Sequence, residues 1–178
     1  MSAQKEGQEL ETALNRMHRA YMSAGRAWCW HTFPPFLIDR RLAGGRFMGR
    51  LLGEAPPDYL VFSGGRFFML EAKSFKLERF PWANLKAHQA RQLSILDGFE
   101  GATAALVIRC VPRREVAVVL WAEVEEAWSA WRLVKTTSKR APRGAGSIAW
   151  DELKERAAVV LRWPDVDYLE ALTCKLIC

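Results

Sequence analysis

The sequence predicts an α/β fold with a mixed central β-sheet flanked by helices, and two observations lead to it. Segments with helical periodicity alternate with short apolar runs along all 178 residues. The apolar fraction of 50% and the charged fraction of 26% are typical of a globular chain. We therefore expect a single domain over residues 1–178, large enough to bury a core of its own.

The elements can be assigned in order along the chain. Apolar residues at steps of three and four predict a first helix over residues 8–22, and the aromatic segment 27–33 after it stops at two prolines. Two strands surround the pair Gly64-Gly65. No internal repeat is present. The expected elements are strands at 59–63 and 66–71, a helix at 84–96, strands at 104–110 and 115–122, helices at 123–132 and near 150–156, a strand at 158–162 and a last helix from about Asp165.

Composition argues against several classes of protein. The longest apolar stretch, at 115–122, is far too short to span a bilayer, and the N-terminus has no signal-peptide pattern. The four cysteines show no CxxC spacing, so neither a zinc site nor a disulfide framework is favoured. We expect a reduced, cytoplasmic protein with no membrane partner and no small-molecule substrate.

The net charge of +6 is unevenly distributed. Residues 40–50 and 132–143 are basic and rich in small side chains, whereas 123–126 is acidic. Basic, glycine-containing loops suit a polyphosphate partner, because Lys and Arg replace condensed counterions. Simple solubility is the alternative. The candidate DNA contacts are Arg40, Arg41, Arg46, Arg50, Lys135, Lys139, Arg140 and Arg143.

The Gly64-Gly65 pair fixes the register of the hairpin around it. Both positions of a two-residue turn can take positive φ when they are glycine, so Ser63 should face Arg66, and the pairing continues outward. Asp58 then lies opposite Glu71, with Cβ atoms roughly 5 Å apart. Lys73 points to the same face, because side chains in a strand alternate.

Two carboxylates held that close repel each other unless a positive charge lies between them. A hard divalent cation with oxygen ligands is a natural occupant, and Mg²⁺ often takes only one or two carboxylates plus water. Lys73 could then orient or deprotonate a water or stabilise charge on a phosphate. The alternative is an ordinary cross-strand cluster of ion pairs, and spacing alone does not separate the two interpretations.

Longer motifs carry a resemblance to a known family. The short pattern of Pro57-Asp58 followed by Glu71-Ala72-Lys73 resembles the PD-(D/E)xK nuclease signature. The chain as a whole resembles RecU-type Holliday-junction resolvases, through GxxLE at 7–11, FPPFLI at 33–38, PPDY at 56–59, LEAKS at 70–74, RFPWANLKAHQ at 79–89 and VDYLEAL at 166–172. The resemblance implies a restriction-endonuclease-like core and a homodimer that cuts four-way DNA junctions with two symmetric, Mg²⁺-dependent incisions, for which Mn²⁺ can substitute.

The resemblance also implies roles for individual residues. Asp58, Glu71 and the backbone carbonyl of Ala72 would be metal ligands and Lys73 the catalytic lysine. Glu11 would be a further acid, lent to the metal site by the first helix. Helical periodicity alone does not choose between Glu11 and Glu9, since they flank opposite edges of the apolar stripe.

A polar residue of the second predicted helix has support of its own. Gln89 falls on the apolar stripe of that helix, where a polar side chain needs a buried partner. It is either a satisfied core amide or part of the active site, and the resemblance favours the site. His31 stands where the family usually carries Lys, and we include it among the candidate DNA contacts.

One segment departs from the family pattern. The family's stalk, which reaches into the junction centre, corresponds here to a shorter insertion at about 36–55. Its arginines could grip phosphates, with Phe47 and Met48 available to unstacked bases; a disordered basic loop is the alternative. The functional hypothesis is thus a junction-resolving endonuclease acting in recombination, repair or phage DNA processing. The alternatives are a related nuclease for flaps or duplex and a non-catalytic junction-binding scaffold.

Overall fold

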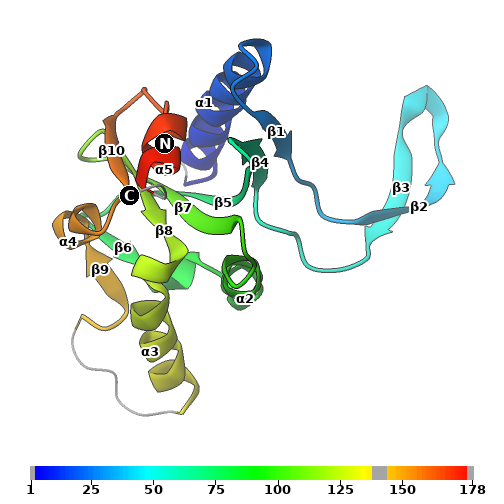
Figure 1. Ribbon diagram of the computed structural model, residues 1–178. Helices are drawn as coiled ribbons and strands as arrows, with labels where there is room; N and C mark the ends of the chain where they lie inside the picture. Colours follow the sequence, from blue (N-terminus) through cyan, green and yellow to red (C-terminus); the bar gives the residue numbers. More distant parts are fainter. Residues whose placement is uncertain (1–2, 138–143, 176–178) are drawn as a thin grey trace.

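A six-stranded sheet forms the centre of the computed structural model, which describes residues 3–137 and 144–175 (Figure 1). Its strand order is β1-β4-β5-β7-β8-β10. The strands are β1 (Trp28–His31), β4 (Tyr59–Ser63), β5 (Arg66–Phe75), β7 (Ala102–Cys110), β8 (Glu115–Leu120) and β10 (Val159–Arg162). Only β5 and β7 run parallel, and the other neighbours are antiparallel, so the predicted mixed sheet is confirmed.

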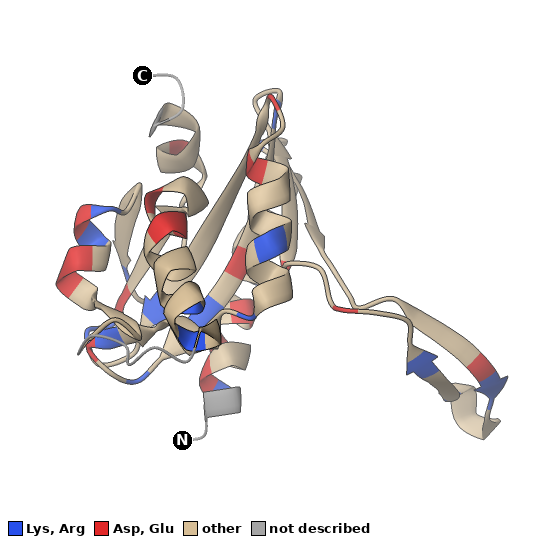
Figure 2. Cartoon of the chain, turned by 90° about the horizontal axis from the view of Figure 1, so that it is seen from below, with Lys and Arg blue, Asp and Glu red and all other residues tan. Residues whose placement is uncertain are grey.

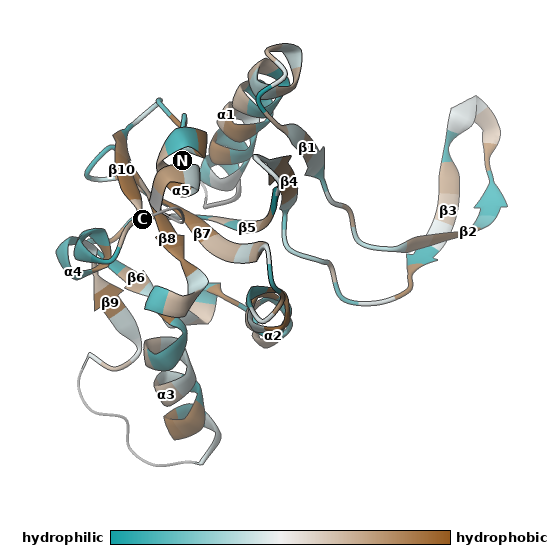
Figure 3. Cartoon of the chain, in the orientation of Figure 1, coloured by the Kyte–Doolittle hydropathy of each residue, from teal (hydrophilic) through white to brown (hydrophobic). Residues whose placement is uncertain are grey.

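Helices cover both faces of this sheet, and each face has its own apolar cluster. Helices α1 (Ala3–Ser23) and α5 (Leu169–Lys175) pack on one face; α2 (Ala87–Asp97), α3 (Glu125–Thr136) and α4 (Trp150–Glu155) pack on the other. The central strands β7 and β8 are buried on both faces, and Figure 3 shows their apolar character. The layered α/β architecture expected from the alternation of elements is therefore confirmed.

Local sequence explains most element boundaries. In α1, residues Leu10, Leu14 and Tyr21 are buried at helical spacing. The hairpin of β4 and β5 has the predicted register, from Ser63 opposite Arg66 to Tyr59 opposite Leu70, and its turn glycines both have positive φ. Strand β5 runs four residues past its predicted end. None of the described helices is long and apolar enough to cross a membrane.

Several short elements complete the chain. A second sheet pairs β6 (Arg79–Pro81) with β9 (Ser147–Ala149), and neither strand was predicted. The region predicted as one helix from residue 84 is the 3-10 turn η2 (Trp82–Asn84) followed by α2, and the 3-10 turn η3 (Trp121–Glu123) precedes α3. The last helix begins at Leu169, later than the predicted Asp165.

The segment between Pro35 and Pro56 forms an ordered hairpin, which we call the arm. It consists of β2 (Phe36–Arg41), the 3-10 turn η1 (Ala43–Gly45) and β3 (Phe47–Leu51), and it extends away from the body of the molecule (Figure 1). The structure thus gives this segment as a β-hairpin rather than an irregular loop. At Gly49 a Cβ would lie 2.0 Å from the carbonyl oxygen of Leu37, so the register shift of the arm requires glycine there.

Candidate active site

The hairpin brings Asp58, the residue just before β4 begins, beside β5. The Oδ2 atom of Asp58 accepts a hydrogen bond of 2.8 Å from the backbone N–H of Ala72, and its own carbonyl accepts one of 2.9 Å from Thr32. The N–H and C=O groups of one strand residue point to the same edge of the strand. The carbonyl of Ala72 therefore points to the edge where the Asp58 carboxylate lies.

Glu71 is the most enclosed carboxylate of this region, with no solvent-exposed surface. Its Oε1 atom is ion-paired with Lys73 and accepts a hydrogen bond of 2.5 Å from Nε2 of Gln89. Its Oε2 atom has no hydrogen-bond partner within the described part of the chain. Burial raises the pKa of Glu71 to about 7, and the charge of Asp58 adds to this effect, while Lys73 opposes it.

Gln89 joins helix α2 to this carboxylate. While its Nε2 contacts Glu71, its Oε1 accepts a hydrogen bond of 3.0 Å from the backbone N–H of Lys86, which satisfies one group at the helix start. The side chain is buried, as its place on the apolar stripe predicted. The buried partner expected for this amide is thus the Glu71 carboxylate rather than a group of the apolar core.

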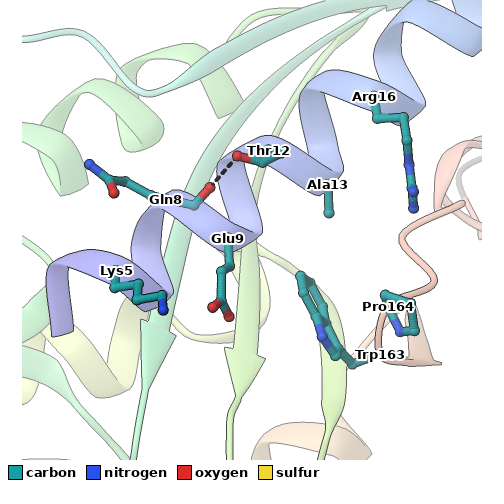
Figure 4. Close-up of a pocket in the computed structure, with 8 residues that line it drawn as sticks. All are labelled: Lys5, Gln8, Glu9, Thr12, Ala13, Arg16, Trp163 and Pro164. Atoms are coloured by element: carbon teal, nitrogen blue, oxygen red, sulfur yellow. Dashed lines mark hydrogen bonds between the residues drawn. The ribbon is translucent and has the colours of Figure 1, made fainter. Parts of the chain in front are cut away.

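Glu9 and Glu11, the two acids between which helical periodicity did not choose, lie on different flanks of α1. Glu9 forms an ion pair of 3.0 Å with the buried Arg109, beside a cavity of about 400 Å³ that Trp163 also lines (Figure 4). Glu11 lies on the Asp58 side: burial raises its pKa, and the nearby charge of Asp58 raises it further. The structure thus brings Glu11, and not Glu9, to the region of Asp58, Glu71 and Lys73.

The oxygen atoms at this edge fit a hard cation of the Mg²⁺ type. A fully buried carboxylate with one unpartnered oxygen is costly to maintain without a positive partner. The carbonyl of Ala72 and the carboxylate of Asp58 lie at the same edge, and Mg²⁺ commonly takes one or two carboxylates and fills its remaining positions with water. No group of three His, Cys, Asp or Glu side chains suited to a metal ion occurs among the described residues.

The predicted DNA contacts are only partly brought together. Arg40, Arg41, Arg46 and Arg50 are all exposed on the arm, and Figure 2 shows basic segments along it. His31 is half-buried at the root of the arm and stacks on Tyr59 with ring centroids 4.7 Å apart. Lys135 lies on α3, which extends from the opposite side of the body (Figure 1). Lys139, Arg140 and Arg143 fall outside the described residues.

Two sets of contacts connect the arm to the site, and sequence analysis predicted neither. Thr32 hydrogen-bonds to the carbonyls of both Pro57 and Asp58, so the outgoing root of the arm is attached beside a candidate metal ligand. On the return segment, Glu54 forms an ion pair of 3.1 Å with Arg91 and lies 3.5 Å from Nδ1 of His88, both on α2. No spacing in the sequence signals either connection, because both arise from contacts between distant segments.

Comparison with known families gives one match. The family model described as recombination protein U, RecU, matches residues 5–173, which is nearly the whole chain. The match includes every candidate catalytic residue and the arm, and it confirms the resemblance to RecU-type Holliday-junction resolvases. A search of curated proteins finds no significant match.

Proposed function

Because the chain belongs to the RecU family, whose members act on Holliday-junction DNA, we propose that it resolves four-way junctions by metal-dependent phosphodiester hydrolysis at a PD-(D/E)xK-type site. The proposal rests on one observation above all. Glu71 is completely buried, yet one of its oxygens has no partner in the described structure, and it lies beside Asp58 and Lys73. A chain with no use for a cation at this edge would gain stability by replacing Glu71 with an apolar residue.

The residues around Glu71 have two roles in the proposed site: some would bind the ion and others orient its ligands. Asp58, Glu71 and the Ala72 carbonyl would hold the ion. Mg²⁺ bound there would lower the pKa of a bound water and stabilise charge on the attacked phosphate. Mn²⁺ has the same ligand preference. Gln89 and Lys73 bind Oε1 of Glu71 and so fix the direction of Oε2. The hydrogen bond from Ala72 orients Asp58 in the same way.

We propose that Lys73 acts on the phosphodiester itself. Its ammonium group is mostly buried next to Glu71, with 18% of the side chain exposed. From there it can donate hydrogen bonds to a non-bridging phosphate oxygen, whose negative charge grows as water attacks phosphorus. The bond from phosphorus to the 3′ oxygen then breaks, and the proton lost by water ends on the leaving oxygen or in solvent.

Resolution of a junction also needs two cuts. The residues Asp58, Glu71 and Lys73 come from a single chain, so one copy supplies one site. Two incisions related by the two-fold symmetry of a junction need two copies related in the same way, and we therefore propose an isologous homodimer.

Direct titration of the metal tests this site independently of DNA cleavage. Calorimetry with Mn²⁺ should show binding to the wild-type protein and a loss of at least about tenfold in affinity for Glu71→Gln and for Asp58→Asn. The control is Glu152→Gln, an isosteric change at an exposed acid of α4 that pairs with Arg156. Equal metal affinity in Glu71→Gln and Glu152→Gln would show that Glu71 holds no ion.

A further inference from the structure

The return segment, residues 52–58, connects the arm to the candidate metal site. Strand β3 ends at Leu51 and β4 begins at Tyr59, so in the described structure this segment belongs to no strand or helix (Figure 1). Asp58 is its last residue. The position of this carboxylate therefore depends on the contacts that hold the return segment, as well as on the hydrogen bond from Ala72.

Two prolines restrict the end of the return segment. Pro56 and Pro57 directly precede Asp58, and each proline fixes its own φ and limits the conformation of the residue before it. The carbonyl of Pro57 also accepts a hydrogen bond from the hydroxyl of Thr32. Because few dihedral angles are free between Glu54 and Asp58, the placement of Glu54 constrains the placement of Asp58.

Glu54 attaches the return segment to helix α2. Its carboxylate forms an ion pair of 3.1 Å with Arg91 and lies 3.5 Å from Nδ1 of His88, which is three residues earlier on the same helix. The side chain of His88 is only 14% exposed, so its position on the helix is well defined. A different ion pair of the arm, between Arg50 and Asp39, stays within the arm. The contacts of Glu54 therefore join the arm to the body of the molecule.

The helix that Glu54 contacts also supports the second candidate ligand. Gln89 directly follows His88 in α2, and its Nε2 donates the hydrogen bond of 2.5 Å to Oε1 of Glu71. That bond directs the other oxygen of Glu71, which has no partner in the described structure. Glu54 thus lies between the supports of both carboxylates, which are the segment that ends at Asp58 and the helix that orients Glu71.

We propose that Glu54 is a positioning residue, which holds the return segment of the arm against α2 and so fixes Asp58 relative to Glu71. This role rests on the proposed function, which assigns both carboxylates to one ion. Glu54 itself would contact neither the ion nor the phosphodiester. Its ion pair with Arg91 is exposed to solvent, so its effect on metal binding should be smaller than that of a group bound directly to a ligand.

The test compares Glu54→Ala with Glu152→Ala. Glu152 is the matched control, because its side chain is 49% exposed against 55% for Glu54 and it forms an ion pair with Arg156, away from the site. We expect Glu54→Ala to lower the Mn²⁺ affinity measured by calorimetry, and the cleavage rate of a saturated junction, each by about three- to tenfold. Neither quantity should change in Glu152→Ala. Junction affinity and thermal melting should be close to wild type in both variants.

Exchanging the two charges tests the ion pair itself. Glu54→Arg and Arg91→Glu each bring like charges together and should lower the Mn²⁺ affinity at least as much as Glu54→Ala does. The double variant has the ion pair in the reverse order and should recover most of the wild-type affinity. Such recovery at an unchanged melting temperature would not occur if Glu54 acted only through the overall stability of the fold.

Failure of this role and failure of the proposed function give different results. Equal Mn²⁺ affinity in Glu54→Ala and Glu152→Ala, or a double variant no better than the single ones, would overturn the role of Glu54 even if the wild type cuts junctions. If Glu54→Ala weakens Mn²⁺ binding as expected but the wild type cuts no junction, the role of Glu54 stands and the proposed function fails. A wild type that binds no Mn²⁺ overturns both.

Discussion

Asp58 and Ala72 are joined by a hydrogen bond of 2.8 Å from the backbone N–H of Ala72 to a side-chain oxygen of Asp58. This bond replaces the next rung of the β4–β5 ladder, whose last pair is Tyr59 opposite Leu70. It fixes a carboxylate at the edge of β5 where the Ala72 carbonyl emerges, beside the buried Glu71. The candidate site thus exists because the hairpin stops pairing at this residue.

Removing either carboxylate should separate DNA binding from cleavage. We expect Asp58→Asn and Glu71→Gln each to reduce junction cleavage to below about 1% of wild type. Junction binding should stay the same or tighten, because each change removes a negative charge near the phosphates. Gel-shift and cleavage assays on the same junction check both points. Cleavage by Asp58→Asn at the wild-type rate would contradict the assignment of the metal site.

Gln89→Ala should damage catalysis more than stability. The change removes the bond that holds Oε1 of Glu71 and leaves the Lys86 N–H without its capping partner. We expect a 10- to 100-fold lower cleavage rate, as is typical for groups that orient a metal ligand, and a stability loss of about 1 kcal/mol.

The matched control for this prediction lies on the same helix. Ser94 also makes partly buried side-chain hydrogen bonds, with Glu125 and Trp121, but it does not contact Glu71. Ser94→Ala should therefore lower the melting temperature by a similar amount and leave the cleavage rate near wild type. Equal loss of rate in both variants would mean that Gln89 acts only through helix stability.

The arm should supply contacts that a junction offers and a linear duplex does not. Replacing Arg40, Arg41, Arg46 and Arg50 by Ala should weaken junction binding more than duplex binding. It should also flatten the salt dependence of affinity by about one unit for each lost phosphate contact. Binding measured at several salt concentrations checks this, with Lys135→Ala on α3 as the comparison. Equal losses on junction and duplex would mean that the arm contributes only general charge.

The pH dependence of stability should carry a contribution from His18. This side chain is buried against Tyr168, and burial lowers its pKa to about 4 from the ordinary value of 6.5. Because the unfolded chain binds a proton below pH 6.5 and the folded chain does not until about pH 4, stability falls as the pH falls through this window. We expect a loss of about 2 kcal/mol between pH 7 and pH 5.

His18→Gln separates this contribution from other titrating groups. Chemical denaturation at several pH values should show a shallower loss of stability in the variant between pH 6.5 and 4, whatever its stability at pH 7. An unchanged slope would show that His18 is not the group responsible.

Local sequence rules predicted the parts of the fold that depend on neighbouring residues. The Gly64-Gly65 turn gave the register of the hairpin and so the approach of Asp58 to Glu71, and the buried stripe of α2 predicted that Gln89 has a buried partner. The family match confirms the resemblance carried by the longer motifs. Local sequence rules could not decide whether Glu11 or Glu9 lies near the site. That depends on the ion pair of Glu9 with Arg109, which is 100 positions away in the sequence.

The elements that were missed depend on contacts between distant segments. Strands β6 and β9 are three residues each and pair across 66 positions of sequence, which leaves no alternating pattern to detect. Strand β5 was predicted to span residues 66–71, where the apolar run of the sequence stops. It continues to Phe75 because its other edge pairs with β7.

Cleavage of three DNA substrates in the presence of Mg²⁺ tests the central claim most directly. The protein would be incubated with a four-way junction, a flap and a linear duplex, each labelled on every strand, with Asp58→Asn as the inactive control. We predict paired, symmetric nicks in the junction, little or no cutting of the other two, and no cutting by the variant. Tight binding of the junction without any cleavage, in Mg²⁺ or Mn²⁺, would contradict the account and identify the protein as a junction-binding scaffold.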